Sequence, residues 1–206
     1  IDAAKAKLKA LTGMEFDDFM LLDKLNTPSD KLRDNPSKYL LYCDPFMGIF
    51  DAHITEGVNA YYKELYNKLS AIKATDDYKP YFESAAALAD VLSIKAELGI
   101  KTRAAYLAGD TKALKCIAEN DYAAAIEKLR AFHTKFRKFW FFENKPHGFD
   151  VQDIRLGGLI MRLESCRDRL LEFCSDTEKK IPELSEPVLE DERFRFWENI
   201  ATANVM

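Results

Sequence analysis

Apolar residues recur at three- and four-residue spacing from about residue 55 to residue 174, which is the period of an amphipathic α-helix. The spacing predicts four long helices, over about residues 55–73, 78–108, 111–142 and 150–174. Only a few residues connect the last three, and such short connections bring successive helices back antiparallel. The sequence therefore predicts an all-α fold, an up-and-down bundle of about four long helices. Its predicted core includes Leu88, Leu92, Leu129, Phe132, Phe136 and Met161.

The fourth predicted helix carries three further signals. Asp150, with Asp153 three residues later, resembles a capping box at its start. Gly157 and Gly158 lie inside the helix, where two glycines cost about 2 kcal/mol relative to alanine, so we interpret them as a place where another backbone approaches closely. The predicted apolar stripe of this helix consists of Val151, Ile154, Met161, Leu170 and Phe173.

The first 52 residues have a different pattern. Two short amphipathic stretches are divided at Thr12-Gly13, and Gly13 is suited to end the first helix. Residues 35–51 combine prolines and a glycine with many apolar groups, which predicts an irregular, partly buried connection with at most a short helix. We therefore divide the chain into residues 1–52, short helices packed on the bundle, and residues 53–206, the bundle with an irregular C-terminal tail, together forming one domain.

Composition narrows the classes of partner. Hydrophobic residues make up 48% of the chain and charged residues 31%, as in a packed, helix-rich protein. The formal net charge is −4, so neither a phosphate backbone nor an anionic membrane attracts the chain, and we expect no nucleic-acid or membrane partner. Basic and aromatic residues interleave over residues 128–140, but at helical spacing they occupy opposite faces, which favours an amphipathic core helix over a nucleic-acid surface.

Candidate cofactor and metal chemistry is sparse. The three histidines, His53, His133 and His147, do not stand at ligand spacing from one another, and no phosphate loop, dinucleotide fingerprint or nucleophile elbow occurs. We expect no metal, no cofactor and no catalytic residue. Four cysteines without a Cys-x-x-Cys pair predict buried free thiols in a reducing compartment. The first residue, Ile1, indicates an excised or processed piece.

Two acids in residues 42–51, Asp44 and Asp51, have two interpretations. They could form a carboxylate pair for glycoside chemistry, but acids beside Pro45 and Gly48 more often cap turns by accepting backbone hydrogen bonds. We favour the capping interpretation. An adjacent acid pair, Asp191-Glu192, lies in a charged run with no predicted strand before it.

Two segments, Pro36 to Asp51 and Asn144 to Leu159, resemble the helical C-terminal domain of a bacterial branch of glycoside hydrolase family 20, the β-N-acetylhexosaminidases. The resemblance implies a separate (β/α)₈ barrel with an adjacent Asp-Glu pair, which uses the acetamido group of the substrate as nucleophile. This chain has neither the length nor the strands for that barrel, so the catalytic roles are not transferred to Asp191-Glu192. It also implies a bacterial cytoplasmic protein.

The resulting hypothesis is a non-catalytic helical domain of an exo-β-N-acetylhexosaminidase that packs on the catalytic barrel of the same polypeptide, supports a homodimer, or shapes the rim of the sugar pocket. The alternative is a free-standing helical adaptor that binds a partner protein through an apolar groove. We expect the two segments to meet at one end of the bundle, with Arg155 bound to Asp44 or Asp51. An internal staple between the segments is the competing interpretation. The candidate interface residues are Tyr42, Asp44, Asp51, Asn144, His147, Asp153 and Arg155.

Overall fold

The structure is a computed structural model that describes residues 1–28 and 35–188. Within these residues the chain forms helices and turns, without strands. The α-helices are α1 (Asp2–Thr12), α2 (Phe16–Asp23), α3 (Pro36–Tyr42), α4 (Val58–Ala71), α5 (Lys79–Lys95), α6 (Leu98–Leu107), α7 (Thr111–Cys116), α8 (Ala123–Glu143), α9 (Phe149–Ser175) and α10 (Pro182–Ser185). Two 3₁₀ turns, η1 (Lys24–Asn26) and η2 (Asp51–His53), and a π-helical segment, η3 (Ile117–Tyr122), complete the set.

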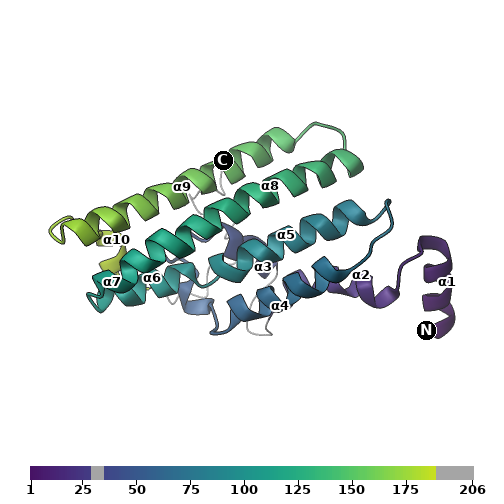
Figure 1. Cartoon of the computed structure of the whole chain (residues 1–206), viewed down its shortest axis with the longest axis horizontal. Coiled ribbons are helices and arrows are strands. Elements are labelled where there is room, and N and C mark those ends of the chain that lie inside the picture. The colour runs from purple at the N-terminus through teal and green to yellow at the C-terminus, as the bar shows by residue number, and fades with distance from the viewer. Residues whose placement is uncertain (29–34, 189–206) are drawn as a thin grey trace.

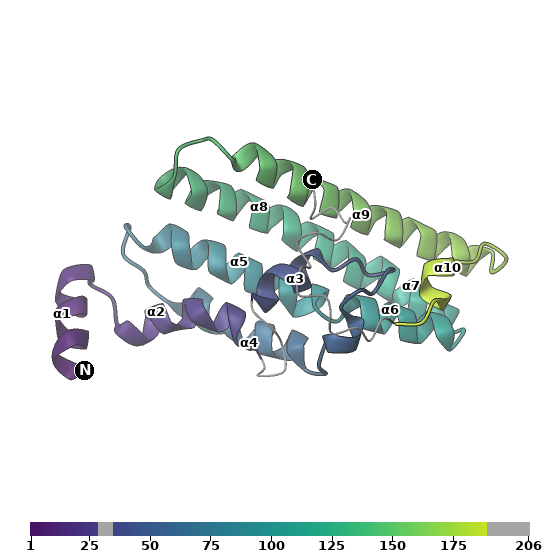
Figure 2. The same cartoon turned by 180° about the vertical axis from the view of Figure 1, so that it is seen from behind.

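The long helices form the predicted all-α up-and-down bundle. Helix α4 packs on α5, α5 on α8, and α8 on α9, so that neighbours in the chain are also neighbours in space (Figure 1). Helix α3 lies across the bundle against α5, as the reverse view shows (Figure 2). Helix α1 stands beyond α2, at the same end of the bundle as the α8–α9 turn.

The predicted helix over 78–108 is divided into α5 and α6 around Ala96 and Glu97. The side chain of Glu97 accepts a hydrogen bond from the backbone N–H of Asn59 at 2.8 Å, and its own N–H donates to the Asn59 side chain at 3.1 Å. Asn59 also donates to the carbonyl of Ile94 at 3.3 Å. The Glu97 N–H and the Ile94 carbonyl are backbone groups that a continuous helix would pair internally, and the Asn59 N–H is an unpaired donor of the first turn of α4, so the division joins the start of α4 to the middle of the α5–α6 pair. By contrast, α7, η3 and α8 follow one another without interruption, as predicted for 111–142.

The predicted core is confirmed for Leu92, Leu129 and Phe132, which are buried, while Leu88 and Phe136 are half-buried. The prediction that Met161 belongs to the core is wrong, because its side chain is 60% exposed. It lies nine residues before the buried Leu170, which is about two and a half helical turns, so the two residues point to opposite sides of α9. The buried face of α9 consists instead of Phe149, Leu156, Leu159, Ile160, Leu163, Cys166, Leu170 and Phe173.

Three other predictions about α9 and the cysteines need correction. The helix begins after Gly148, whose N–H donates to Asp150 at 3.1 Å, while Asp153 bonds to His133 instead of closing a capping box. A side chain at Gly157 would meet no described atom within 4 Å, so no described backbone approaches there. All four cysteines are free, but only Cys43 and Cys166 are buried, since Cys116 is exposed and Cys174 half-buried.

Candidate functional site

Residues 42–51 begin at the last residue of α3, and Asp44 fixes the turn that follows. Its Oδ1 accepts hydrogen bonds from the backbone N–H groups of Phe46 and Met47 at 2.9 and 3.0 Å. The capping interpretation of Asp44 is therefore confirmed. Arg162 of α9 also binds this carboxylate in a bidentate manner, with Nε 2.5 Å from Oδ2 and Nη2 3.1 Å from Oδ1. Burial alone would raise the pKa of Asp44, but these donors outweigh it and lower the pKa.

Three arginines of α9 hold residues 42–46, and we call Arg155, Arg162 and Arg169 the arginine row. They are spaced by seven residues, which is close to two helical turns, so they lie along one side of the helix. The guanidinium carbon of Arg155 lies 4.9 Å from the centre of the Tyr42 ring. Arg162 and Arg169 lie 5.5 and 5.2 Å from the centre of the Phe46 ring. Each contact has the geometry of a cation–π interaction, so the row fixes the segment by charge and packing together.

Arg103 of α6 joins the same segment to the C-terminal part of the described chain. Its Nη2 donates to the carbonyl of Phe46 at 2.6 Å, and its Nε lies 3.4 Å from Oδ2 of Asp51. Its Nη1 donates to the carbonyls of Glu183 and Glu186 at 3.0 and 3.1 Å. Arg169 then binds the Glu183 side chain with two bonds of 2.6 and 2.8 Å. Residues 42–51, α6, α9 and α10 are thus tied together by buried or half-buried arginines.

Asp51 differs from Asp44, although it belongs to the same segment. Its Oδ1 is buried and accepts no hydrogen bond within the described residues. Burial raises the pKa of Asp51, and the charge of Arg103 only partly opposes this shift. Gly48 allows the tight packing here: its φ is 61°, and a Cβ at this position would lie 2.5 Å from Asp51 Oδ2 and 2.7 Å from Arg103 Nη2.

Lys95, the last residue of α5, is buried beneath α3. Its Nζ donates to the carbonyl of Cys43 at 2.5 Å and approaches that of Leu40 at 3.5 Å, so a cation lies at the C-terminal end of α3, where the helix dipole favours it. Burial lowers the pKa of Lys95. Burial also raises the pKa of Cys43 to about 11 and that of Cys166 to about 12, so both thiols stay protonated at neutral pH and are poor nucleophiles.

The α8–α9 turn is organised differently, because its polar residues face solvent. Asn144 and His147 are exposed, and Asp153 is exposed with its Oδ1 2.6 Å from Nε2 of His133. The buried Phe149 ring packs beneath the turn against Phe136, Trp140 and Phe141. Four large apolar side chains remain exposed around it, and we call them the α8–α9 surface: Phe141, Phe142, Val151 and Ile154.

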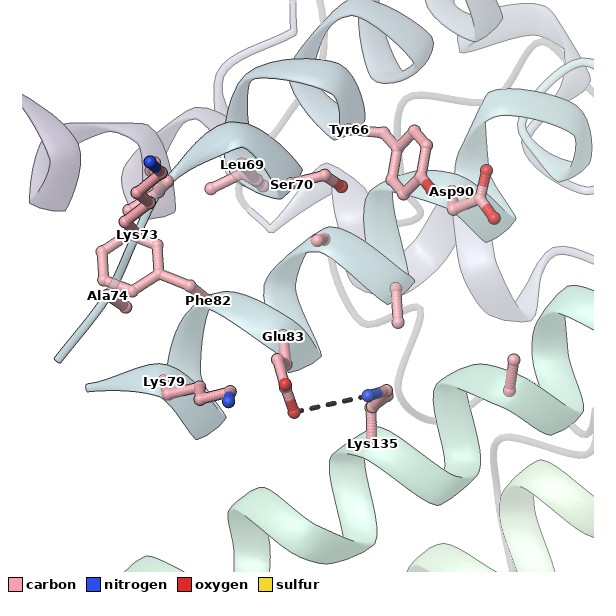
Figure 3. A pocket seen from close by; sticks show the side chains of 14 residues that line it. Tyr66, Leu69, Ser70, Lys73, Ala74, Lys79, Phe82, Glu83, Asp90 and Lys135 are labelled. Atoms are coloured by element: carbon pink, nitrogen blue, oxygen red, sulfur yellow. Dashed lines mark hydrogen bonds and ion pairs between the residues drawn. The ribbon is translucent and has the colours of Figure 1, made fainter. Parts of the chain in front are cut away.

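A cavity of about 510 Å³ opens between α4, α5 and α8 (Figure 3). Glu83 and Lys135 face each other across it, with Nζ 3.4 Å from Oε2. Asp90, also on its wall, is bound by Lys128 at 2.6 Å. These pairs join α5 to α8, and their charges are of opposite sign. The two ion pairs neutralise Glu83 and Asp90, and Lys73, Lys79, Ser70 and Tyr66 complete the polar part of the lining.

The two segments that carry the family resemblance do meet, although not as predicted. They meet at Tyr42 and Arg155, beside a cavity of about 300 Å³ lined by both segments. Asp44 and Asp51 bind Arg162 and Arg103, so the predicted pairing with Arg155 is wrong. The meeting point lies along the side of the bundle, against α5, and the α8–α9 turn occupies its end (Figure 2). This geometry favours the competing interpretation, in which the contact between the two segments is an internal staple.

Sequence reasoning missed Arg162, Arg169 and Arg103. The sequence shows the seven-residue spacing of the arginine row. Spacing alone does not predict which of the three arginines binds Asp44. The described residues contain no group of three His, Cys, Asp or Glu side chains arranged to hold a metal ion. No described helix is long and apolar enough to cross a membrane. The Asp191-Glu192 pair and the end of the predicted irregular tail, residues 189–206, lie outside the described residues.

The fold and the site define a class of protein: an all-helical bundle domain. In it, three arginines of the longest described helix, α9, bind residues 42–46. Residues 17–200 match the family described as the Glycoside Hydrolase 20C C-terminal domain, so the chain belongs to that family. Domains of this family are part of a larger family 20 glycoside hydrolase polypeptide, as the resemblance implied. No curated protein matches the chain.

Proposed function

We propose that the chain is a non-catalytic module that packs on the catalytic barrel of the same polypeptide through the α8–α9 surface. The observation that carries this proposal is the exposure of four large apolar side chains on the two helices that the α8–α9 turn connects: Phe141, Phe142, Val151 and Ile154, the last of them 51% exposed. Large apolar side chains that are exposed beside polar groups are typical of protein interfaces. Asn144, His147 and Asp153 supply such a rim.

The position of α1, on the N-terminal side of the bundle, supports the barrel as the occupant of this surface. A C-terminal domain is reached from its N-terminal side, and α1 lies at the same end of the bundle as the α8–α9 turn (Figures 1 and 2). A barrel on the N-terminal side of this domain therefore joins it through α1, at the end of the bundle where these apolar side chains are exposed. Membership of the family also favours such a module over a free-standing adaptor.

The non-catalytic role follows from how the candidate acids are used. A general acid or base must reach the reacting atom of the substrate. Asp44 and Asp51 are buried and bound by Arg162 and Arg103, so both are committed to holding residues 42–51. The isolated chain is expected to release no chromophore from a chromogenic N-acetylglucosaminide above a mock preparation, and measurable turnover would contradict the proposal.

The docking proposal is tested in the full polypeptide with Phe142→Asp and Ile154→Asp. Leu107→Asp is the matched control, because Leu107 is an exposed leucine at the end of α6, near the opposite end of the bundle. Burying a carboxylate in an apolar interface is unfavourable, so both test variants should lower the Tm of the barrel by at least about 2 °C, and the control should not. Equal Tm values in all three would contradict docking at this surface. A fall in molecular mass to that of a monomer, with an unchanged barrel Tm, would assign the surface to a homodimer instead.

A further inference from the structure

The cavity between α4, α5 and α8, which we call the lysine cavity, has an apolar floor. Helix α5 lies between the other two helices and contributes Ala86 and Ala87, whose short side chains leave space above them. Phe82 and Leu69 add a buried ring and a buried aliphatic side chain. A volume of about 510 Å³ is in the range of sites that hold small organic molecules. The cavity is thus large enough for a ligand with an apolar body.

The two carboxylates of the lysine cavity are bound by lysines of α8. Lys135 and Lys138 both lie 3.4 Å from Oε2 of Glu83, and Lys128 lies 2.6 Å from Oδ1 of Asp90. Burial alone would raise the pKa of Glu83, but the two lysines outweigh it and lower the pKa. The surroundings of Glu83 therefore exert a positive electrostatic potential on its carboxylate.

Two further lysines of the wall, Lys73 and Lys79, are exposed, and their side chains pair with no described residue. Lys73 follows the end of α4 and Lys79 begins α5, so both lie on the side of the cavity near the α4–α5 turn (Figure 3). The N-terminal end of α5 adds partial positive charge there. Asp76 and Asp77 of this turn form no ion pair within the described part of the chain. This side of the cavity therefore has two cations that no described carboxylate binds, in a chain whose formal net charge is −4.

The apolar floor and the cationic side of the cavity together restrict the class of ligand. An inorganic anion would meet the lysines but leave the floor uncovered, and a neutral apolar molecule would cover the floor without meeting the charge. A ligand with an apolar body and an anionic group satisfies both, because an ion pair is stronger in a partly desolvated site than in water. The hydroxyls of Ser70 and Tyr66 on the α4 wall offer hydrogen bonds to further polar groups of such a ligand.

We propose that the lysine cavity binds a small amphipathic anion. The apolar ring or chain of this ligand packs on Phe82, Ala86 and Ala87, and its carboxylate or phosphate binds Lys73 and Lys79. The site consists of side chains of this chain and shares none of them with the α8–α9 surface, so it does not rest on the proposed function. A ligand bound there contacts α4, α5 and α8 together, and it stabilises the bundle by mass action.

Isothermal titration calorimetry of the full polypeptide tests the proposal with three probes. 1-Naphthyl phosphate carries the apolar body and the anionic group together, 1-naphthol carries the body without the charge, and inorganic phosphate carries the charge alone. The first probe should bind at least about tenfold more tightly than either of the others. Equal affinities for 1-naphthyl phosphate and 1-naphthol would overturn the proposal, because the lysines would then contribute nothing.

A pair of double variants locates the anionic group. Lys73→Gln combined with Lys79→Gln should weaken the binding of 1-naphthyl phosphate at least about tenfold and leave that of 1-naphthol unchanged. Lys7→Gln combined with Lys112→Gln is the matched control, because these exposed lysines also pair with no described residue and lie outside the cavity. The control should bind both probes as the wild type does.

The apolar body is located by Ala87→Phe, which fills the floor of the cavity and keeps every lysine. Ala87 is half-buried on the cavity wall, so the added ring takes the place of the ligand, and the affinity for 1-naphthyl phosphate should fall at least about tenfold. Circular dichroism reports that each variant is folded. Equal losses in the two lysine double variants, or unchanged affinity in folded Ala87→Phe, would overturn the proposal.

Discussion

Residues 42–51 and residues 144–153, which include the α8–α9 turn, each contain a proline, a glycine and two aspartates, yet the fold uses them in opposite ways. In the first region Asp44 and the Phe46 carbonyl are bound by Arg162 and Arg103, and the segment is held against the bundle. In the second, Asn144 and His147 face solvent beside exposed apolar side chains. The difference shows that polar composition alone does not distinguish a structural clamp from a surface for a partner. The side chains that surround each region decide between them.

The largest expected effect is the loss of the arginine that holds Asp44. Arg162→Met should lower the free energy of unfolding by about 3–5 kcal/mol, because removing one partner leaves a buried carboxylate without its counter-charge. Chemical denaturation of the chain measures this. Arg167→Met is the matched control, since Arg167 lies five residues later on α9 and pairs only with its exposed neighbour Asp168 among the described residues.

The control should change the free energy of unfolding by less than about 0.5 kcal/mol. Adding Asp44→Asn to Arg162→Met should recover part of the loss, because the unpaired charge is then removed. A loss below about 1 kcal/mol in Arg162→Met would show that residues 42–51 are held by other contacts.

A smaller effect is expected at Gly48. Gly48→Ala forces a side chain into a left-handed backbone position and against Asp51 and Arg103, which should cost about 2–3 kcal/mol. Gly57→Ala separates the two causes, because Gly57 also has a positive φ, 89°, but a Cβ there meets nothing within 4 Å. It should cost only about 1 kcal/mol. Equal losses in the two variants would mean that the packing around Asp51 is loose.

Lowering the pH should change the contributions of Asp44 and Asp51 to stability in opposite directions. The folded-state pKa of Asp44 is lowered, so its contribution to stability is complete above its unfolded pKa of about 3.9 and is lost as the pH falls through the folded value. The folded-state pKa of Asp51 is raised, so its ionisation removes stability as the pH rises through that value. In urea unfolding between about pH 3 and pH 7, Asp44→Asn should reduce the loss of stability in acid and Asp51→Asn should increase it. The same change of slope in both variants would refute this account.

Much of the fold could be predicted from sequence because it depends on local periodicity. The bundle, its short turns and the buried Leu92, Leu129 and Phe132 all follow from three- and four-residue spacing. Two features depended on distant residues and could not be predicted in this way. The division near Glu97 rests on Asn59, 38 residues away, and the exposure of Met161 depends on which of two apolar faces of α9 meets α8.

For the candidate site, the sequence predicted which segments meet but not which residues pair. The family resemblance marked residues 36–51 and 144–159, and the structure joins them at Tyr42 and Arg155. The partner of Asp44 is Arg162, one heptad beyond the predicted Arg155, because the three arginines repeat every seven residues and only the position of α3 along the bundle selects among them. A position along a neighbouring helix is a tertiary property that the local sequence does not encode.

The most direct measurement is amide hydrogen exchange of the chain alone compared with the same residues in the full polypeptide. A docked partner slows exchange where it covers the surface, whereas residues already clamped inside the bundle gain nothing further. The account predicts slower exchange in the full polypeptide over residues 141–154, with no change over residues 42–51. New protection over residues 42–51, or none over residues 141–154, would contradict it.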